Sequence, residues 1–584
     1  MCEILLPLHH KGKMAEWSKA HAWKACVPQK GIKGSNPFLS ARLNYNATYA
    51  MGVPRSFSSF ETGTAVVIGA GPAGMTAARE LQRQTSLNPV VIEQDETVGG
   101  LSKTMLHHGN RMDIGGHRFF SKDQRINDWW EHYLPAQSAP AMDDLLTGRR
   151  IPFREDGADP EQTDRVMLHR QRISRIYFLR RFFDYPVTFS WSTIRNLGAG
   201  RLLQAGWGYL KSTFRPLPET SLENFYINRF GKPLYNWFFA SYTEKVWGIH
   251  PSRLSAGWGA QRVKGLSIGV VLRNIWEKAC RREKDRQAVE TSLIEQFSYP
   301  KLGPGQLWEL VADDVRQQGG RIFLQTQVTG IRLENHRVVS VTLTGKDGST
   351  REQPCDCLIS TMPLKELVSV IRGETVPDAV REIADGLPYR DFMAVSICAD
   401  RLKIKNNTKY KTFMDRIPDT WIYIQEHGVR MGRLQLFNNW SPYMVKDYRN
   451  TVWMEAEYFC QEGDSLWNMT DAQCIRMAVK ELEEIGFLEP DAVRDACCVR
   501  VRKAYPTYAG TYHRMDTLRT WLDGIDNLYC IGRNGQHRYN NMDHSMLTAM
   551  ACIDAIRSGT PEHRAAIWAV NTEEVYHETR NDRS

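Results

Sequence analysis

The sequence lacks any apolar run long enough to cross a membrane. No stretch reaches 18 consecutive apolar residues, so we expect no transmembrane segment. The amino terminus also lacks the apolar core and cleavage pattern of a secretory signal peptide. The twelve cysteines are scattered: Cys355 and Cys357 are one residue apart, Cys497 adjoins Cys498, and neither spacing suits a zinc site or a disulfide framework. We therefore expect reduced thiols, no bound metal and a cytoplasmic location.

A basic block of the kind that binds nucleic acid is also missing. The formal net charge is +9, but residues 1–50 hold seven Lys or Arg and two Asp or Glu, which accounts for five of the nine charges. The other 534 residues carry the remaining four. We expect no nucleic-acid partner, whereas a local site for an anion stays open. The sequence does not indicate an oligomeric state.

Residues 1–50 show neither helical nor strand periodicity. Within them, Gly34 to Pro37 reads Gly-Ser-Asn-Pro, which the T-loop consensus of a transfer-RNA gene encodes in one reading frame. One hypothesis is that roughly these residues are translated from an adjacent transfer-RNA gene or an erroneous upstream start, with Met51 as the true initiator. The alternative is a disordered extension. In both cases residues 1–60 form a leader outside the folded domains.

A buried-strand pattern at Thr64–Ile68 leads directly into G-x-G-x-x-G, formed by Gly69, Gly71 and Gly74, and then into helix-forming residues. A second short strand ends in Glu93, 19 residues after Gly74. This order predicts a dinucleotide-binding βαβ unit. Its glycines permit a tight turn, a close approach of backbone N–H groups to a pyrophosphate and close helix–strand packing, while the helix amino terminus favours the anion. Glu93 is placed to accept hydroxyl hydrogens of an adenosine ribose.

Two glycine pairs follow, in VGGLSKT at Val98–Thr104 and in DIGGHRFF at Asp113–Phe120. Glycine loses the most conformational freedom on folding, so paired glycines need a reason. A Gly-Gly soon after the ribose acid resembles FAD enzymes of the glutathione-reductase type. In this interpretation Gly115 and Gly116 let the main chain approach a flavin ring with His117 beside it. The alternative is a tight turn whose histidine bonds its own backbone.

The middle of the chain mixes helical and strand patterns. Residues 150–170 are polar and aperiodic, which predicts a surface insertion. Thr220 and Glu223 predict a capping box at the start of an aromatic-rich helix. Tyr299–Leu343 predicts a glycine-rich turn, a helix, a strand and a hairpin, and residues 365–500 are rich in strands.

The last patterns place another helix terminus beside the dinucleotide unit. A helix is predicted around Thr470–Ile485, and later a strand ends at Ile531. A polar, glycine-containing turn follows, and a helix begins near Met542. This helix amino terminus predicts a second site for an anion.

Several segments, taken in order, resemble the UDP-galactopyranose mutases, especially the eukaryotic-type branch, and more broadly the amine oxidase and protoporphyrinogen oxidase flavoprotein superfamily. The segments are DIGGHRFF, YTEKVWG, GWGAQRV, YPKLGPGQLW, LISTMPL, TWIYIQE, GRLQLFNNWSP, AYPTY and GRNGQHRYNNMDHSM. The resemblance implies an α/β fold with an FAD-binding, glutathione-reductase-like Rossmann domain, a helical substrate domain and an antiparallel sheet. The FAD-binding domain is expected in three pieces, residues 61–150, 291–364 and 501–560. An insertion and the helical substrate domain are expected at 151–290, and the antiparallel-sheet substrate domain at 365–500. Residues 1–60 form the leader and 561–584 a tail.

The resemblance also implies which residues bind FAD. They are Gly69, Gly71, Ala73, Gly74, Glu93, Gly100, Leu101, Gly115, Gly116, His117, Val328, Gly532, Arg533, Asn541, Met542, Asp543 and Ser545. Of these, Arg533 is expected at the pyrophosphate and Asp543 at the pyrimidine edge of the flavin. His117 is expected beside the ring, in a loop that shifts with redox state.

In the mutase family the reduced flavin supplies the nucleophile that displaces UDP from C1 of galactose, so no nucleophilic side chain is required. The protein must instead bind the departing diphosphate, for which the forked guanidinium of arginine is suited. The resemblance assigns this role to Arg262 and Arg433. It places Tyr505 and Tyr539 at the diphosphate or the sugar, and His117 completes the expected catalytic set.

Other functions stay open at this point. Tyr508 stands where eukaryotic-type members usually have proline, and the uridine-binding segment of the family is not recognisable. One alternative is a net oxidoreductase that acts on an amine, a porphyrinogen or a polyene. Arg262 and Arg433 distinguish the mutase from this oxidoreductase, because a diphosphate substrate needs them and an apolar substrate does not. A non-catalytic flavoprotein is disfavoured by the dense cofactor motifs. Only one dinucleotide fingerprint is visible, so NAD(P)H as reductant would use the active-site mouth.

Overall fold

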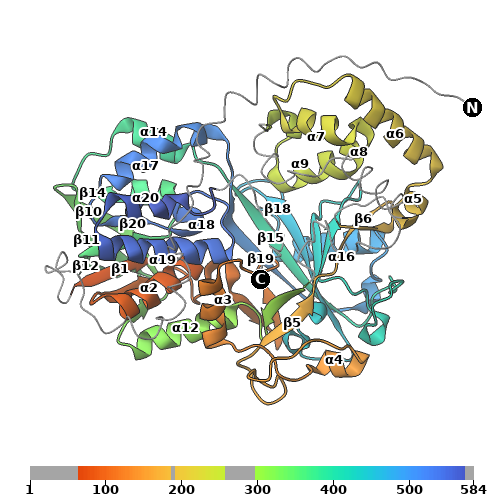
Figure 1. Ribbon diagram of the computed structural model, residues 1–584, viewed down its shortest axis with the longest axis horizontal. Helices are drawn as coiled ribbons and strands as arrows, with labels where there is room; N and C mark the ends of the chain where they lie inside the picture. The colour runs from red at the N-terminus through yellow and green to blue at the C-terminus, as the bar shows by residue number, and fades with distance from the viewer. Residues whose placement is uncertain (1–62, 186–190, 255, 257–295, 573–584) are drawn as a thin grey trace, which may run out of the picture. The chain divides into compact units, whose positions relative to one another are not determined.

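A five-stranded parallel sheet forms around the first predicted strand, β1 (Thr64–Ile68) (Figure 1). Its order is β20–β13–β1–β2–β9, and each neighbouring pair is parallel. The other four strands are β2 (Asn88–Ile92), β9 (Arg321–Phe323), β13 (Cys357–Ser360) and β20 (Leu528–Cys530). The sheet thus assembles strands that lie far apart in the sequence.

The computed structural model describes residues 63–185, 191–254, 256 and 296–572, all within one compact unit, Ser56–Ser584. Arg262 and the rest of the GWGAQRV segment lie outside the described residues, as do residues 1–60. Within the described ranges, no helix combines the length and the apolarity that a membrane crossing requires.

The parallel sheet is buried on both faces, which explains the continuous apolar run of β1. Ala65 and Val67 pack into one hydrophobic cluster, whereas Val66 and Ile68 pack into another on the opposite face, as the alternation of side chains along a strand requires. Helices on the first face are α2 (Pro72–Gln84), α3 (Gln124–Tyr133), α12 (Gly305–Gln317) and α19 (Met542–Ser558). The second face is covered by α13 (Leu364–Ser369), α14 (Asp378–Asp385), α17 (Met515–Asp523) and a smaller sheet.

The smaller sheet contains the predicted hairpin. Its order is β12–β11–β10–β14, and β10 (Thr326–Glu334) pairs antiparallel with β11 (Arg337–Gly345). The other members are β12 (Thr350–Pro354) and β14 (Ile371–Arg372). The turn, helix, strand and hairpin expected over Tyr299–Leu343 are confirmed by α12, β9, β10 and β11.

A seven-stranded sheet carries the chemistry described below. Its order is β19–β15–β18–β17–β16–β6–β7, antiparallel except for the β16–β6 pair. The strands are β6 (Ser174–Phe178), β7 (Arg181–Asp184), β15 (Tyr389–Ala399), β16 (Trp421–Ile424), β17 (Arg433–Leu436), β18 (Val452–Cys460) and β19 (Val493–Pro506). β6 and β7 precede the range 365–500 in which this sheet was expected, and β19 extends beyond it. Together the layers confirm the expected α/β fold class.

A helical segment follows β7 in the sequence. It contains α5 (Trp191–Leu197), α6 (Ala199–Phe214), α7 (Leu222–Phe230), α8 (Lys232–Tyr235), a π turn (Asn236–Ala240) and α9 (Ser241–Trp247). The predicted capping box of Thr220 and Glu223 is wrong by one residue. Ser221 is the N-cap, and its hydroxyl accepts a hydrogen bond of 3.2 Å from the backbone N–H of Asn224. Serine caps as well as threonine does, and this register buries Leu222 in the first turn.

The polar stretch at residues 150–170 is a surface insertion only in its first part. Phe153 is exposed, whereas Met167, Leu168 and Arg170 are buried in β5 (Met167–Gln171), which pairs with β8 (Gln296–Pro300). The apolar partners of β5 were not visible in the local pattern. The remaining elements are β3 (Thr104–His107), β4 (Asn110–Asp113), α4 (Met142–Thr147), α15 (Phe437–Trp440), α16 (Asp471–Glu484), α18 (Gly532–Gly535) and α20 (Pro561–Ala569). The helix predicted around Thr470–Ile485 is confirmed by α16.

Candidate active site

The carboxyl ends of the parallel strands bring the predicted cofactor residues to one edge of the sheet. Gly69 directly follows β1 and Glu93 directly follows β2, while Gly532 comes two residues after the end of β20. Thr361 directly follows β13, and its hydroxyl donates to the carbonyl of Ile68 at 2.8 Å. Ligands of open α/β sheets bind at this edge. The edge of the sheet therefore has the arrangement that a dinucleotide requires.

Two glycine loops meet at this edge. A Cβ atom added to Gly100, whose φ is +53°, would lie 3.0 Å from Cα of Gly71. The N–H of Gly99 donates to the carbonyl of Ala70 at 2.8 Å. Leu101 then packs into a hydrophobic cluster that also holds Tyr505 and Tyr539. The first glycine pair thus joins the pyrophosphate-type turn to the region of the predicted catalytic tyrosines.

Glu93 is buried beside the first glycine turn. Its Oε2 accepts a hydrogen bond of 2.7 Å from the N–H of Ala70, and its Oε1 accepts one of 2.9 Å from the N–H of Asp95. Burial raises the pKa of its carboxyl group above the usual value. A carboxylate has about four lone-pair sites, so two stay free for ribose hydroxyls. The predicted role of Glu93 is compatible with this geometry.

The other predicted cofactor residues lie around α2, α19 and β10. A Cβ atom added to Gly532 would lie 2.8 Å from Cβ of Ala73, and the N–H of Gly532 donates to the hydroxyl of Thr548 at 2.9 Å. Asn541 is the N-cap of α19, so the peptide groups of Met542, Asp543 and Ser545 belong to its first turn. Burial raises the pKa of Asp543. Val328 is buried beside Val90 and Ile92 of β2, and Gly74 is buried in α2.

The DIGGHRFF loop passes close against an indole ring. A Cβ atom added to Gly116 would overlap the six-membered ring of Trp421 in β16, so only glycine fits there. Gly115 adopts a φ of +81°, in the left-handed region. The loop thus takes a tight path over the seven-stranded sheet, as its glycines predicted.

His117 emerges from this loop half-buried. Its Nδ1 is buried close to the backbone of Gly115. Burial lowers the pKa of the imidazole to about 4, and the positive charge of Arg533 acts in the same direction. His117 is therefore neutral at physiological pH. The backbone of Gly115 also interacts with the imidazole and opposes the lowering of its pKa, as the alternative of a loop histidine that bonds its own backbone predicts.

Three buried acids lie close to the loop. Asp113 ends β4 and accepts hydrogen bonds from the hydroxyls of Tyr299 and Thr104. Burial raises its pKa to about 7. Glu455 and Glu457 of β18 are each 1% exposed, and burial raises the pKa of both. This concentration of buried acid was not predicted from the sequence.

The positive charge of Arg433 compensates part of the negative charge of these acids. Its Nη1 donates to Oε2 of Glu457 at 3.3 Å and to the hydroxyl of Tyr505 at 3.4 Å, and its Nε donates to the hydroxyl of Tyr242 at 3.0 Å. The guanidinium carbon lies 5.1 Å from the ring centroid of Trp421. Arg433 is thereby a largely buried cation, with 14% of its side chain exposed, that three partners hold in place. Tyr242 and Glu457 were missed as partners, although Tyr242 lies within the YTEKVWG segment.

Two stacked tyrosines complete the group. The rings of Tyr505 and Tyr539 lie 5.8 Å apart, centroid to centroid, at 14°. The guanidinium of Arg533 lies 4.7 Å from the ring of Tyr539, with Nε donating to Asn540 O and Nη1 to Ala504 O at 2.8 and 2.9 Å. Burial raises the pKa of the Tyr505 phenol to about 12, so it stays a hydrogen-bond donor.

The unexpected Tyr508 has a structural role beside this group. Its hydroxyl accepts a hydrogen bond of 2.8 Å from the backbone N–H of Tyr539, and its ring stacks on Tyr512 at 4.6 Å. Proline at this position would have no hydroxyl. The structure thus brings together His117, Arg433, Tyr505, Tyr539 and Arg533, while Arg262 lies outside the described residues.

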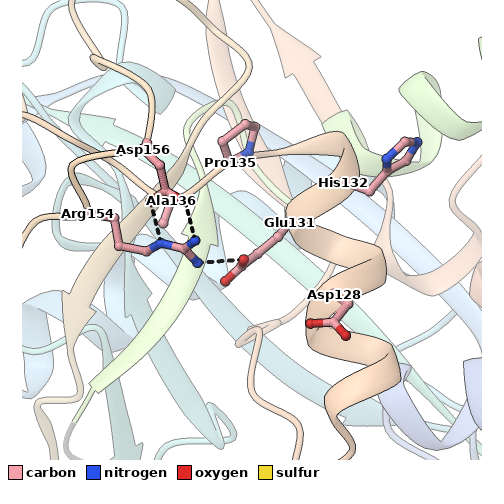
Figure 2. Close-up of a pocket in the computed structure, with 8 residues that line it drawn as sticks. Asp128, Glu131, His132, Pro135, Ala136, Arg154 and Asp156 are labelled. Carbon is pink, nitrogen blue, oxygen red and sulfur yellow. Dashed lines mark hydrogen bonds and ion pairs between the residues drawn. The ribbon is translucent and has the colours of Figure 1, made fainter. Parts of the chain in front are cut away.

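A surface pocket elsewhere does not suit an anionic substrate. It is lined by Asp128, Glu131, His132, Pro135, Ala136, Arg154, Asp156 and Gly157 (Figure 2). Its arginine, Arg154, already donates to Glu131 at 2.6 Å and to both carboxylate oxygens of Asp156 at 3.0 and 2.7 Å. Acidic groups therefore dominate this pocket.

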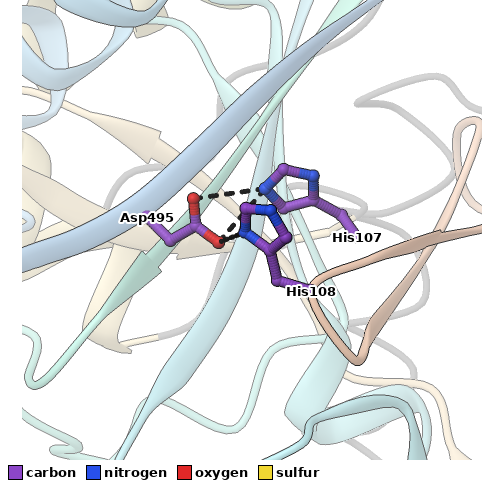
Figure 3. A group of neighbouring side chains, drawn as sticks. All are labelled: His107, His108 and Asp495. Carbon is purple, nitrogen blue, oxygen red and sulfur yellow. Dashed lines mark hydrogen bonds and ion pairs between the residues drawn. The ribbon is translucent and has the colours of Figure 1, made fainter.

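A cluster of two histidines and an acid links β19 to the hairpin that leads into the DIGGHRFF loop (Figure 3). His108 Nδ1 lies 2.8 Å from Oδ2 of Asp495, and His107 Nε2 lies 3.2 Å from Oδ1. Imidazole and carboxylate are donors that transition metals accept, and these three side chains are close enough for shared coordination. In the described structure they satisfy one another, which fastens the β3–β4 hairpin to the sheet.

Comparison with known proteins agrees with this geometry. A family model described as flavin containing amine oxidoreductase matches residues 72–540. A solved structure of reduced UDP-galactopyranose mutase aligns with a TM-score of 0.68 at 22% identity, over 88% of this chain and 98% of that one. A putative protoporphyrinogen oxidase from Exiguobacterium sp. 255-15 gives 0.57 at 15% identity, over 85% and 99%, and cyclohexylamine oxidase from Brevibacterium oxydans IH-35A gives 0.53 at 12%, also over 85% and 99%. These structures share the fold, and the family match spans most of the sequence. The protein belongs to the flavin-containing amine oxidoreductase family.

Proposed function

We propose that the protein is an FAD-dependent enzyme of the UDP-galactopyranose mutase type, which interconverts the pyranose and furanose forms of a nucleotide sugar. The observation that carries the proposal is the buried cation Arg433, held between Tyr242, Tyr505 and Glu457 close to the stacked tyrosines. A diphosphate substrate needs a fixed cation, whereas an apolar substrate does not. Surface polysaccharide synthesis is the process that such an activity would serve.

Bound FAD in its reduced form would supply the nucleophile toward the anomeric carbon. The chain itself would stabilise the departing diphosphate. Arg433 is fixed by three partners and loses little freedom when it binds an anion. The phenols of Tyr505 and Tyr539 can donate further hydrogen bonds, since the raised pKa of Tyr505, about 12, keeps its proton in place.

His117 would serve as an uncharged hydrogen-bonding group beside the flavin. With a pKa lowered to about 4 by burial, its imidazole can accept at one nitrogen and donate at the other. The glycines before it give the loop room to approach the isoalloxazine ring and to move from it.

The test is turnover by the purified full-length protein. Bound FAD is verified by its absorbance spectrum, the flavin is reduced anaerobically with dithionite or NAD(P)H, and conversion of UDP-galactofuranose is followed by chromatography. We expect turnover only with reduced flavin. Oxygen consumption with an amine, without sugar conversion, would support the oxidoreductase alternative instead.

Arg433→Ala tests the diphosphate role directly. We expect it to lose about 100-fold or more in turnover while the FAD spectrum is retained. Arg430→Ala, an exposed arginine three positions earlier in the same segment, is the matched control and should retain activity. Equal activity of the two variants would remove the assignment.

A further inference from the structure

Helix α6 presents a continuous apolar stripe on its outer surface. Leu203, Trp207, Leu210 and Phe214 are 75%, 73%, 49% and 80% exposed. Their spacing of four, three and four residues places them on one helix face. Leu217, just beyond the helix, is 40% exposed. Nowhere else in the described ranges do large apolar side chains gather in the exposed state in this way.

The opposite face of α6 is firmly packed. Ala205 and Ser212 are buried, and a Cβ atom added to Gly208 would overlap the ring of Pro233 in α8. Tyr209 packs into the cluster that contains Leu234 and other residues of the helical segment. At about 100° per residue, the stripe points roughly 180° away from this packed face. The stripe is therefore exposed on a helix whose other face is packed against the rest of the protein.

The charge around α6 has one sign. Between Asp184 and Glu219 the sequence contains four basic residues and no acidic one. The four are Arg195, Arg201, Lys211 and Arg215, and all are exposed. Within the described residues none of them has a carboxylate partner among the ion pairs. An apolar stripe in a segment whose charges are all basic, with Lys211 and Arg215 nearest to it, is complementary to a surface that is apolar inside and anionic outside.

We propose that α6 docks the protein onto the surface of a membrane that contains anionic lipids. The Trp, Phe and Leu side chains would enter the boundary between headgroups and acyl chains, while the basic side chains contact lipid phosphates. The 16 residues of α6 give a length of about 24 Å along the surface. This is attachment to one leaflet and needs no helix that crosses the bilayer.

A second copy of the chain fits this face less well. A two-fold contact would place the same patch against itself. The segment of each copy carries four cations and no acid, so two such segments brought together would repel each other. An anionic lipid surface would instead attract these cations. The inference concerns where the protein works and is independent of the reaction at the flavin.

The test is co-sedimentation of the FAD-loaded full-length protein with vesicles. We expect binding to vesicles of phosphatidylcholine with about 30% phosphatidylglycerol, and much weaker binding to phosphatidylcholine alone or in 0.5 M salt. Trp207→Glu with Phe214→Glu should abolish binding. Leu106→Glu is the matched control, because Leu106 in β3 is 65% exposed and lies outside α6. Lys211→Gln with Arg215→Gln should weaken binding about 25-fold, since each basic side chain near the surface contributes about fivefold.

Three outcomes would overturn the proposal. One is equal binding of the Trp207→Glu, Phe214→Glu variant and the wild type. Another is equal binding to neutral and anionic vesicles. The third is light scattering that shows a dimer, lost in the same variant, without vesicle binding, which would assign the stripe to a second copy. Unchanged FAD content and circular dichroism of each variant establish that it is folded.

Discussion

The indole of Trp421 lies against Gly116, where a Cβ atom would overlap the ring. The same indole contacts the guanidinium of Arg433, 5.1 Å from its centroid. One ring therefore connects the DIGGHRFF loop to the buried cation. A substitution at Gly116 is therefore expected to disturb both the loop and the position of Arg433.

Gly116→Ala should lower the free energy of unfolding by about 1–3 kcal/mol, because a methyl group is forced into a packed contact. Gly206→Ala is the matched control: nothing lies within 4 Å of its added Cβ, and alanine in a helix stabilises by about 1 kcal/mol. Combining Gly116→Ala with Trp421→Ala should recover part of the loss. Denaturant unfolding of the wild type, Gly116→Ala, Trp421→Ala and the double variant measures this coupling, and additive effects would contradict the contact.

The lowered pKa of His117 predicts a loss of stability in acid. Below pH 6.5 an unfolded histidine takes up a proton, whereas folded His117 does so only near its pKa of about 4. The contribution is about 2 kcal/mol between pH 7 and pH 5. Because His537 has a lowered pKa as well, the quantity to compare is wild type minus His117→Asn at each pH. A constant difference would show that His117 titrates normally.

His117→Ala also separates a chemical role from a structural one. We expect FAD to stay bound while the chemistry of the reduced flavin slows, because the neutral imidazole lies in the loop assigned to the flavin. Absorbance of the bound flavin and turnover after anaerobic reduction are the two measurements. If FAD is lost instead, the histidine is structural.

Asp113 predicts the opposite pH dependence. Its carboxyl group is buried with a pKa raised to about 7, so the folded state holds a proton between about pH 4 and pH 7 that the unfolded state has lost. Stability should therefore rise by about 2–3 kcal/mol from pH 8 to pH 5 on account of this group. Asp113→Asn should remove that dependence while the amide oxygen still accepts from Tyr299. Asp128→Asn, on the exposed side of α3, is the control and should leave the dependence intact.

The parts of the fold that local chemistry determines could be predicted from the sequence. The β1–α2–β2 unit, Glu93 after β2 and the start of α19 at Met542 all lie where glycine pattern, apolar run and helix formers placed them. The partners of Arg433 could not be found in this way. Glu457 lies opposite Arg433 because β17 and β18 pair in one particular register, and Trp421 reaches Gly116 across a long stretch of chain. Strand register depends on packing of the whole sheet, which a local pattern does not contain.

Tyr508 supplies the final prediction, because it contacts the main chain at Tyr539. Its hydroxyl accepts a hydrogen bond of 2.8 Å from the backbone N–H of Tyr539. Tyr508→Phe leaves that N–H without its partner, and an unsatisfied donor costs about 1–3 kcal/mol where water is excluded. We expect the backbone of Tyr539 to shift, so that KM for the proposed nucleotide-sugar substrate rises more than turnover falls.

The neighbouring Tyr512→Phe is the matched control, because Tyr512 stacks on Tyr508 at 4.6 Å without contacting the Tyr539 N–H. Both variants keep an aromatic ring, so the difference between them isolates the hydrogen bond. Steady-state kinetics with reduced enzyme and thermal unfolding measure the two effects. Tyr508→Phe with unchanged KM and stability would mean that the Tyr539 N–H finds another acceptor. Tyr508 would then be a neutral replacement of proline, without a part in shaping the site.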